Sequence, residues 1–128
     1  LYTVFGWVIH VGDRSNSRSL RNFPMQANGA EMLRLACCYA TENGIRVCAP
    51  IHDAILIEAP LDQLEETVNT VHSLMGRASE IVLNGFRLRS EAKPIRYPER
   101  YADERGLDMW ETVWEIAGRL GPEAANIE

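Results

Sequence analysis

The sequence lacks any apolar run of membrane-spanning length. A transmembrane helix needs about 18 to 20 consecutive apolar residues, and no segment of the 128 residues approaches that length. The chain begins at Leu1 without an initiator Met, and it lacks the basic flank and cleavage site of a signal peptide. We therefore expect a soluble, cytoplasmic protein with no membrane partner, and we interpret the chain as a piece of a longer polypeptide.

Cysteines are few and do not have the spacing of a metal site. The three are Cys37, Cys38 and Cys48, and no C-x-x-C pair or His partner accompanies them. This pattern is typical of reduced thiols in a cytosolic protein. Because free cysteine is among the most buried residue types, we expect all three to pack in the core.

Lysine is nearly absent, and the acidity is confined to one end of the chain. The chain has twelve arginines and one lysine, and residues 99–128 account for its whole net charge of −5. No acid occurs from residue 14 to residue 30, where Arg14, Arg18 and Arg21 form a local positive patch. The patch is either a solvated loop or a contact for an anionic partner, and charge alone favours the loop.

Hydrophobic periodicity predicts the order β, α, ββ, α, β, followed by an added helix. Strand patterns occur in residues 1–11, 45–51, 54–60 and 85–95. Helical patterns occur in residues 24–42, 61–82 and 107–120. The sum is an α+β fold, in which an antiparallel sheet has helices packed on one face. We expect the two strands on either side of His52-Asp53 to be central in that sheet.

Proline and glycine mark the ends of the first predicted helix. Pro24 suits a first turn, where its missing N–H has no helical partner, and Asn43-Gly44 supplies a stop. Gly29 inside the helix costs about 1 kcal/mol relative to Ala, which indicates a close approach to that backbone. The final residues, 121–128, are expected to fray.

His52 and Asp53 interrupt two strand patterns at the point where the hairpin should turn. A carboxylate at such a tip is held rigidly while its oxygens stay accessible, and Mg²⁺ prefers oxygen ligands. Asp53 is therefore a candidate metal ligand. The alternative is structural, because Asp is a preferred turn residue and His more often packs or caps than catalyses.

Motifs on both sides of the first helix resemble the C-terminal palm of the family A DNA polymerases, the DNA polymerase I family. In that family an Arg, an Asn four residues on and a Gln four further on lead into a long helix. A strand then ends in a His-Asp-Glu motif at a hairpin turn. Here Arg18, Asn22 and Gln26 precede the helical pattern, and His52-Asp53 follows it at the turn.

The rest of residues 1–98 follows the same order. The opening "TVFGW" is similar to the family's T-x-x-G-R hairpin, and the later helix and strand patterns continue the family's sequence of elements. The resemblance therefore divides the chain into a palm portion, residues 1–98, and an acidic C-terminal extension with one amphipathic helix, residues 99–128. It implies a polymerase palm with ferredoxin-like elements.

The resemblance implies a DNA-directed DNA polymerase, a nucleotidyltransferase of DNA replication or repair. Its partners would be primer-template DNA, deoxynucleoside triphosphates and the remainder of the parent polymerase, encoded by a bacterial, phage or plasmid genome. Two Mg²⁺ ions would serve the reaction. Asp53 would be the family's second metal-binding aspartate, and His52 would contact the primer terminus.

The residues before the first helix would bind the newly made duplex. Arg18, Asn22 and Gln26 match the family's minor-groove contacts, and Arg21 lies beside them as a further DNA-binding residue. Every correct base pair presents purine N3 and pyrimidine O2 acceptors in that groove, so donors there verify pair geometry without reading sequence. The alternative is that Asn22 caps the helix and the others are only polar surface.

Two residues depart from the family pattern, and two motifs lie outside the chain. Ala54 replaces the Glu after His-Asp, and Ala27 replaces the Gly after Gln26. The family's Asp-x-Ser-x-x-Glu strand and its nucleotide-binding helix both precede this region. One carboxylate cannot assemble a two-metal site, so the isolated chain is expected to be inactive.

Two other functions are open. One is a non-enzymatic ferredoxin-like α+β domain that binds nucleic acid or a protein partner, with Asp53 as a turn residue. The other is a degenerate polymerase retained for DNA binding, which Ala54 suggests.

Overall fold

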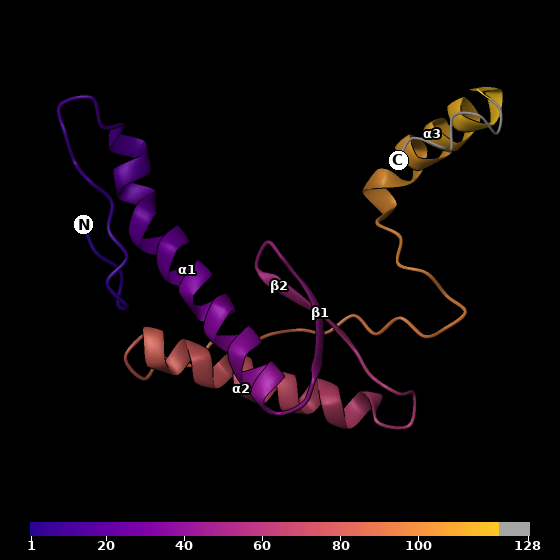
Figure 1. Cartoon of the computed structure of the whole chain (residues 1–128), viewed down its shortest axis with the longest axis horizontal. Helices are drawn as coiled ribbons and strands as arrows, with labels where there is room; N and C mark the ends of the chain where they lie inside the picture. The colour runs from indigo at the N-terminus through magenta and orange to yellow at the C-terminus, as the bar shows by residue number, and fades with distance from the viewer. Residues whose placement is uncertain (121–128) are drawn as a thin grey trace. The chain divides into compact units, whose positions relative to one another are not determined.

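The first unit of the chain, Leu1–Ala92, contains a two-stranded antiparallel sheet and two long helices. The structure is a computed structural model that describes residues 1–120, so the predicted fraying of residues 121–128 lies outside the described residues. In chain order the elements are α1 (Ser17–Glu42), β1 (Arg46–Ile51), β2 (Ala54–Glu58), α2 (Leu64–Val82), a 3-10 turn (Glu104–Gly106) and α3 (Leu107–Leu120) (Figure 1). The predicted α+β class is confirmed. In residues 1–120 no helix has the length and apolar content that crossing a bilayer requires.

Helix α1 begins seven residues before the predicted start at Pro24. The side chain of Asn16 caps it, because Asn16 Oδ1 accepts hydrogen bonds from the backbone N–H groups of Arg18 (2.8 Å) and Ser19 (3.3 Å). Pro24 therefore lies inside the helix, and its predicted place in the first turn is wrong. A strong cap in a polar loop can extend a helix beyond its apolar stripe, which periodicity does not register.

Of the two remaining predictions for α1, the structure confirms the stop at Asn43-Gly44 but shows no close approach by a described residue where a side chain at Gly29 would lie. Asn43 caps the C-terminus of α1 and Gly44 follows with a φ of +74°, so the predicted stop is confirmed. A Cβ added at Gly29 would meet nothing within 4 Å. The space that a side chain at Gly29 would occupy is therefore open, and the predicted close approach is not found there among the described residues.

Residues 1–9 fold back on themselves as a short hairpin that is anchored to α1. The predicted pair of strands is reduced to one antiparallel bridge, Tyr2 with Val8. The Thr3 hydroxyl donates a buried hydrogen bond to Glu31 Oε1 and accepts one from the Trp7 N–H at 2.9 Å. Glu31 is only 3% exposed. This buried carboxylate thus fixes the N-terminal hairpin against the middle of α1.

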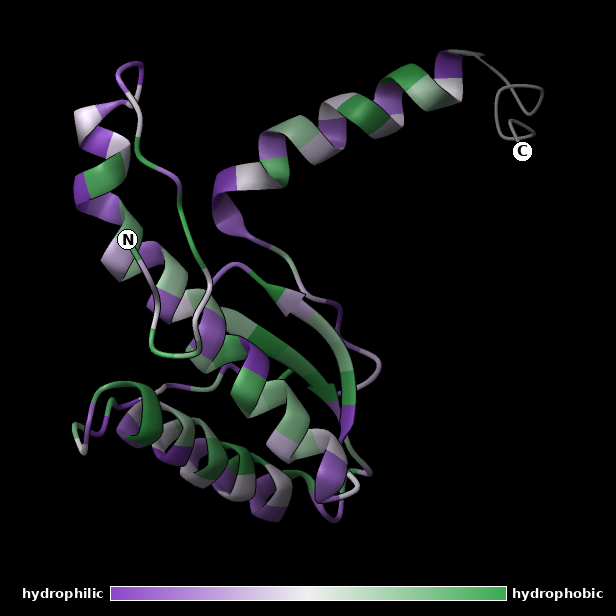
Figure 2. Ribbon diagram, turned by 60° about the vertical axis from the view of Figure 1, so that its left-hand side comes forward, coloured by the Kyte–Doolittle hydropathy of each residue, from purple (hydrophilic) through white to green (hydrophobic). Residues whose placement is uncertain are grey.

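The core lies where α1 packs against α2. The described apolar side chains that are buried are Ala36, Ala40, Val71, Ala78 and Val82. Small residues on α1 let the two helix backbones come close, and the guanidinium of Arg77 lies 4.8 Å from the ring centroid of Tyr39 across the same interface. Helix α1 also contacts both strands. Figure 2 shows that hydrophobic residues predominate in these strands.

The cysteines do not lie in this core. Cys38 and Cys48 are exposed, and Cys37 is partly buried, so the prediction of three buried thiols is wrong for two of them. Cys48 alternates along β1 with the partly buried Val47 and Ala49, so the ordinary alternation of a strand places it on the exposed face. Burial raises the pKa of the Cys37 thiol, and the neighbouring Cys38 raises it further.

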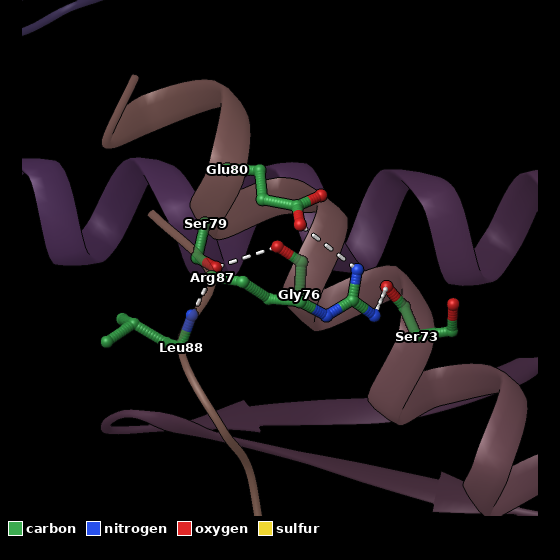
Figure 3. A network of polar contacts seen from close by, with 6 residues as sticks. All are labelled: Ser73, Gly76, Ser79, Glu80, Arg87 and Leu88. Carbon is green, nitrogen blue, oxygen red and sulfur yellow. Dashed lines mark hydrogen bonds and ion pairs between the residues drawn. The ribbon is translucent and has the colours of Figure 1, made fainter. Parts of the chain in front are cut away.

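Residues 86–95 form no strand, although their alternation predicts one. Their polar groups bind α2 instead (Figure 3). The Leu88 N–H donates to Ser79 Oγ at 2.9 Å, and Arg87 pairs with Glu80 at 3.3 Å while also donating to the Ser73 carbonyl. The backbone donor that would join a sheet is thus used by a buried serine. In residues 1–120 the sheet keeps only β1 and β2, so the flanking strands of the turn are not central.

The second unit, which begins at Lys93, contains the 3-10 turn and α3. Helix α3 covers the predicted residues, 107–120. Trp110 and Trp114 stand one turn apart with their rings edge to face, 5.6 Å between centroids, and both are exposed. The predicted amphipathic pattern is therefore present as an open apolar side of α3 within this unit.

Ser79→Ala should lower the free energy of unfolding by about 1–2 kcal/mol. The change removes the acceptor of the Leu88 N–H and leaves that partly buried donor unpaired. Ser73→Ala is the matched control, because Arg87 uses only its backbone carbonyl and the gain in helix propensity is the same. Urea denaturation, monitored by circular dichroism, measures the free energy of unfolding of both variants. Equal stability of the two variants would show that the Ser79 hydroxyl does not hold residues 86–92.

Arg105→Gln should return the pKa of Asp103 toward its ordinary value. Side-chain hydrogen bonds from Arg105, the shorter at 2.7 Å, hold that pKa at about 2. Since the folded pKa is depressed, the pair contributes stability above the ordinary Asp pKa of about 3.9 and loses it as the pH falls toward 2. A carbon-13 NMR titration of the carboxyl tests this. Arg119→Gln, which removes the partner of Glu115, should leave Asp103 unchanged.

Candidate functional site

The β1–β2 hairpin turns on two residues only, His52 and Asp53. Ile51 pairs with Ala54 directly before and after the turn. His52 has a φ of +53°, as the first position of the tight hairpin turns requires. A left-handed backbone is uncommon outside glycine, and His adopts it more readily than β-branched residues do. The predicted position of the pair at a hairpin turn is therefore confirmed.

Both turn side chains are exposed. In the part of the chain that the structure describes, the Asp53 carboxylate accepts no hydrogen bond and forms no ion pair. Its oxygens are therefore free to bind a cation or a donor from outside. Within residues 1–120, Asp53 forms none of the Asx hydrogen bonds to neighbouring backbone N–H groups through which Asp often stabilises turns.

Four predicted DNA-binding residues lie in the N-terminal half of α1. Arg18, Asn22 and Gln26 follow one another at intervals of four, so they share one face of the helix, and all three are exposed. Arg21 lies beside them, and its Nε donates to the Ser17 carbonyl at 3.4 Å. Asn16, not Asn22, caps the helix, which excludes the capping role for Asn22.

The structure brings these residues together as two groups. The α1 face presents one guanidinium, from Arg18, and two amides, from Asn22 and Gln26, along about 12 Å of helix. The turn presents an imidazole and a carboxylate. Helix α1 contacts both strands of the hairpin, but no hydrogen bond or ion pair among residues 1–120 joins the two groups. They are thus separate groups within the first unit.

A metal ion needs more ligands than the turn supplies. Among residues 1–120 no three His, Cys, Asp or Glu side chains gather where they could hold one. Mg²⁺ accepts one or two carboxylates when water and substrate phosphates supply the remaining ligands. Asp53 fits as one such ligand, and further carboxylates would have to come from another segment.

A shallow depression lies elsewhere, on the outer side of α2. Acidic and small polar residues line it, among them Asp62, Glu65, Glu66 and Asn69. None of the predicted site residues contributes to it. Its negative charge makes it unsuitable for a polyanion such as DNA.

Sequence reasoning missed the residues that hold the N-terminal hairpin in place. Glu31 lies in a helical stretch where it resembles any surface acid, yet it is buried against Thr3 and lies 3.9 Å from Arg34. Asn28 Oδ1 also accepts from the Val4 N–H at 3.3 Å. Nothing in the local sequence indicates these contacts, since they join segments more than twenty residues apart.

Comparison of the chain with protein-family models, with curated proteins and with solved structures found no match.

His52→Gly should raise the free energy of unfolding by up to about 1 kcal/mol. A left-handed backbone costs an ordinary residue roughly 1–2 kcal/mol, and the greater freedom of glycine in the unfolded chain offsets part of the gain. His52→Val should lower it by about 1 kcal/mol. Asp53→Gly, where φ is not positive, is the control and should bring no gain. If His52→Gly proves destabilising in urea titrations, the imidazole itself stabilises the turn.

Proposed function

We propose that this chain is the C-terminal part of the palm of a family A DNA polymerase. The observation that carries the proposal is the exposed, unpaired carboxylate of Asp53 on a two-residue turn, directly after His52 with its left-handed backbone. Residues in sparsely populated backbone conformations cluster at functional sites, and the positive φ of His52, which the hairpin turn itself requires, stands beside an unpaired carboxylate. The reaction is template-directed nucleotidyl transfer in DNA replication or repair.

Asp53 holds one side of a site for two Mg²⁺ ions. When bound, such ions activate the attacking hydroxyl and stabilise the leaving oxygens of the triphosphate. Asp53 is attached to a hairpin whose strands both contact α1, so its backbone is linked to the duplex-binding helix through packed elements. His52 positions the primer terminus beside it.

The exposed face of α1 binds the newly formed duplex. Arg18, Asn22 and Gln26 carry side-chain donors, and their interval of four places them along one line. Donors in the minor groove can bond to acceptors that all correct base pairs share. Arg21 adds a positive charge for the phosphates.

The remaining ligands come from the rest of a longer polymerase. Apolar side chains stand exposed on the first unit, including Met25 at 78% and Phe86 at 64%. Without those remaining ligands, the isolated chain lacks activity.

A second candidate function is nucleic-acid binding without catalysis. Ala54 stands beside Asp53 where a supporting carboxylate would otherwise be, and the arginines of α1 suffice to bind phosphates. In that case Asp53 is an ordinary turn residue.

Primer extension by the longer polypeptide separates the two functions. Asp53→Asn keeps the shape of the side chain and removes its charge, and we expect extension with Mg²⁺ to fall at least about a hundredfold, because loss of even an outer-shell partner costs a metal site 10- to 100-fold. Asp62→Asn, an exposed aspartate beyond β2, is the matched control and should extend normally.

Binding of primer-template DNA is measured in parallel and should be unchanged by either substitution. Normal extension by Asp53→Asn would show that Asp53 is not a metal ligand. If the unaltered polypeptide binds primer-template but does not extend it, the second candidate function is correct.

A further inference from the structure

The N-terminal hairpin, residues 1–9, exposes more aromatic surface than its anchoring to α1 requires. Tyr2 is 78% exposed and Trp7 is 64% exposed. The hairpin is nevertheless held firmly, because the Thr3 hydroxyl bonds to the buried Glu31 and the Val4 N–H bonds to Asn28. The Tyr2–Val8 bridge places Tyr2 and Trp7 on opposite faces of the hairpin, so this aromatic platform is an ordered support that carries one ring on each face.

The electrostatic surroundings of this platform are positive. Residues 1–30 contain one acid, Asp13, against the three arginines Arg14, Arg18 and Arg21. The next acid is Glu31, which is buried and bound to Thr3. A polyanion that reaches the aromatic rings therefore meets little repulsion.

The aromatic rings and the arginines lie along the same helix. Figures 1 and 2 both show the segment before α1 running back beside its N-terminal half. The hairpin contacts α1 at Asn28 and Glu31, about 15–20 Å along the helix axis from Arg18. This distance allows one strand of several nucleotides to contact the rings and the arginines together.

We propose that the N-terminal hairpin binds single-stranded nucleic acid, with one unpaired base stacked on Trp7 and another on Tyr2, on the two faces of the hairpin, and with phosphates paired with the arginines of the α1 N-terminus. Aromatic platforms beside basic side chains are the common means of binding single strands without sequence preference. A duplex hides its base faces, so the rings discriminate between the two forms. Neither His52 nor Asp53 takes part, so the proposed site does not need the catalytic turn, although it shares the arginines of α1 with the proposed duplex-binding face.

Fluorescence anisotropy of the whole chain with a fluorescein-labelled oligo(dT) of about 16 nucleotides tests the proposal. Trp7→Leu and Tyr2→Leu should each weaken binding roughly tenfold, since stacking on an aromatic ring contributes about that factor or more per base. Trp110→Leu, an exposed tryptophan of α3, is the matched control and should bind within about twofold of the unaltered chain. Circular dichroism verifies that each variant is folded.

The salt dependence separates stacking from charge. Trp7→Leu should leave unchanged the slope of the logarithm of affinity against the logarithm of salt concentration. Arg14→Gln and Arg21→Gln should each make that slope shallower, by the amount that corresponds to the release of about one counterion. Unchanged affinity in both aromatic variants, or an unchanged slope in both arginine variants, would overturn the proposed site.

A second measurement does not depend on removing an aromatic residue. The chain has three tryptophans, so Trp110→Phe with Trp114→Phe leaves Trp7 as the one tryptophan emitter. Oligo(dT) should quench Trp7, whereas a blunt duplex of equal length should quench it much less. Equal quenching by the duplex, or no quenching by oligo(dT), would contradict stacking. Binding to phosphatidylserine vesicles as tight as to oligo(dT), with a blue shift of Trp7, would identify a membrane surface instead and overturn the proposal.

Discussion

The pairing of β1 with β2 closes through a turn of two residues, and the position of the candidate catalytic carboxylate depends on this constraint. Ile51 and Ala54 pair directly across the turn, which leaves His52 in a left-handed conformation and Asp53 at the outermost point. Both strands contact α1, so the hairpin that carries the turn is packed on the helix. A two-residue turn fixes the backbone position of Asp53 more closely than a longer loop would.

Helix α1 connects everything else in the first unit. Its C-terminal half packs closely on α2 through Ala36 and Ala40, and its middle binds the N-terminal hairpin through Glu31. Its N-terminal half leaves Arg18 and Gln26 exposed. One helix thus joins a core, a hairpin anchor and a basic face, and a ligand that binds this face is held in a defined relation to the turn.

Elements with a strong pattern could be predicted from the sequence. The periodicity of α2 and α3, the stop at Asn43-Gly44 and the strands around His52-Asp53 depend on local preference, and all are present. The early start of α1 depends on one cap at Asn16, and the loss of the last strand depends on Ser79, nine residues from the N–H that it binds. Contacts between distant segments, such as Thr3 with Glu31, leave no local signal and could not be predicted.

The position of the metal relative to Asp53 tests the central claim most directly. Anomalous diffraction from Mn²⁺ would locate it in crystals of the longer polypeptide with primer-template and a non-extendable nucleotide. We predict a manganese ion at direct bonding distance, about 2.0–2.2 Å, from an Asp53 carboxylate oxygen. A metal bound beside the triphosphate with Asp53 outside its coordination shell would contradict the assignment of the turn as an active site.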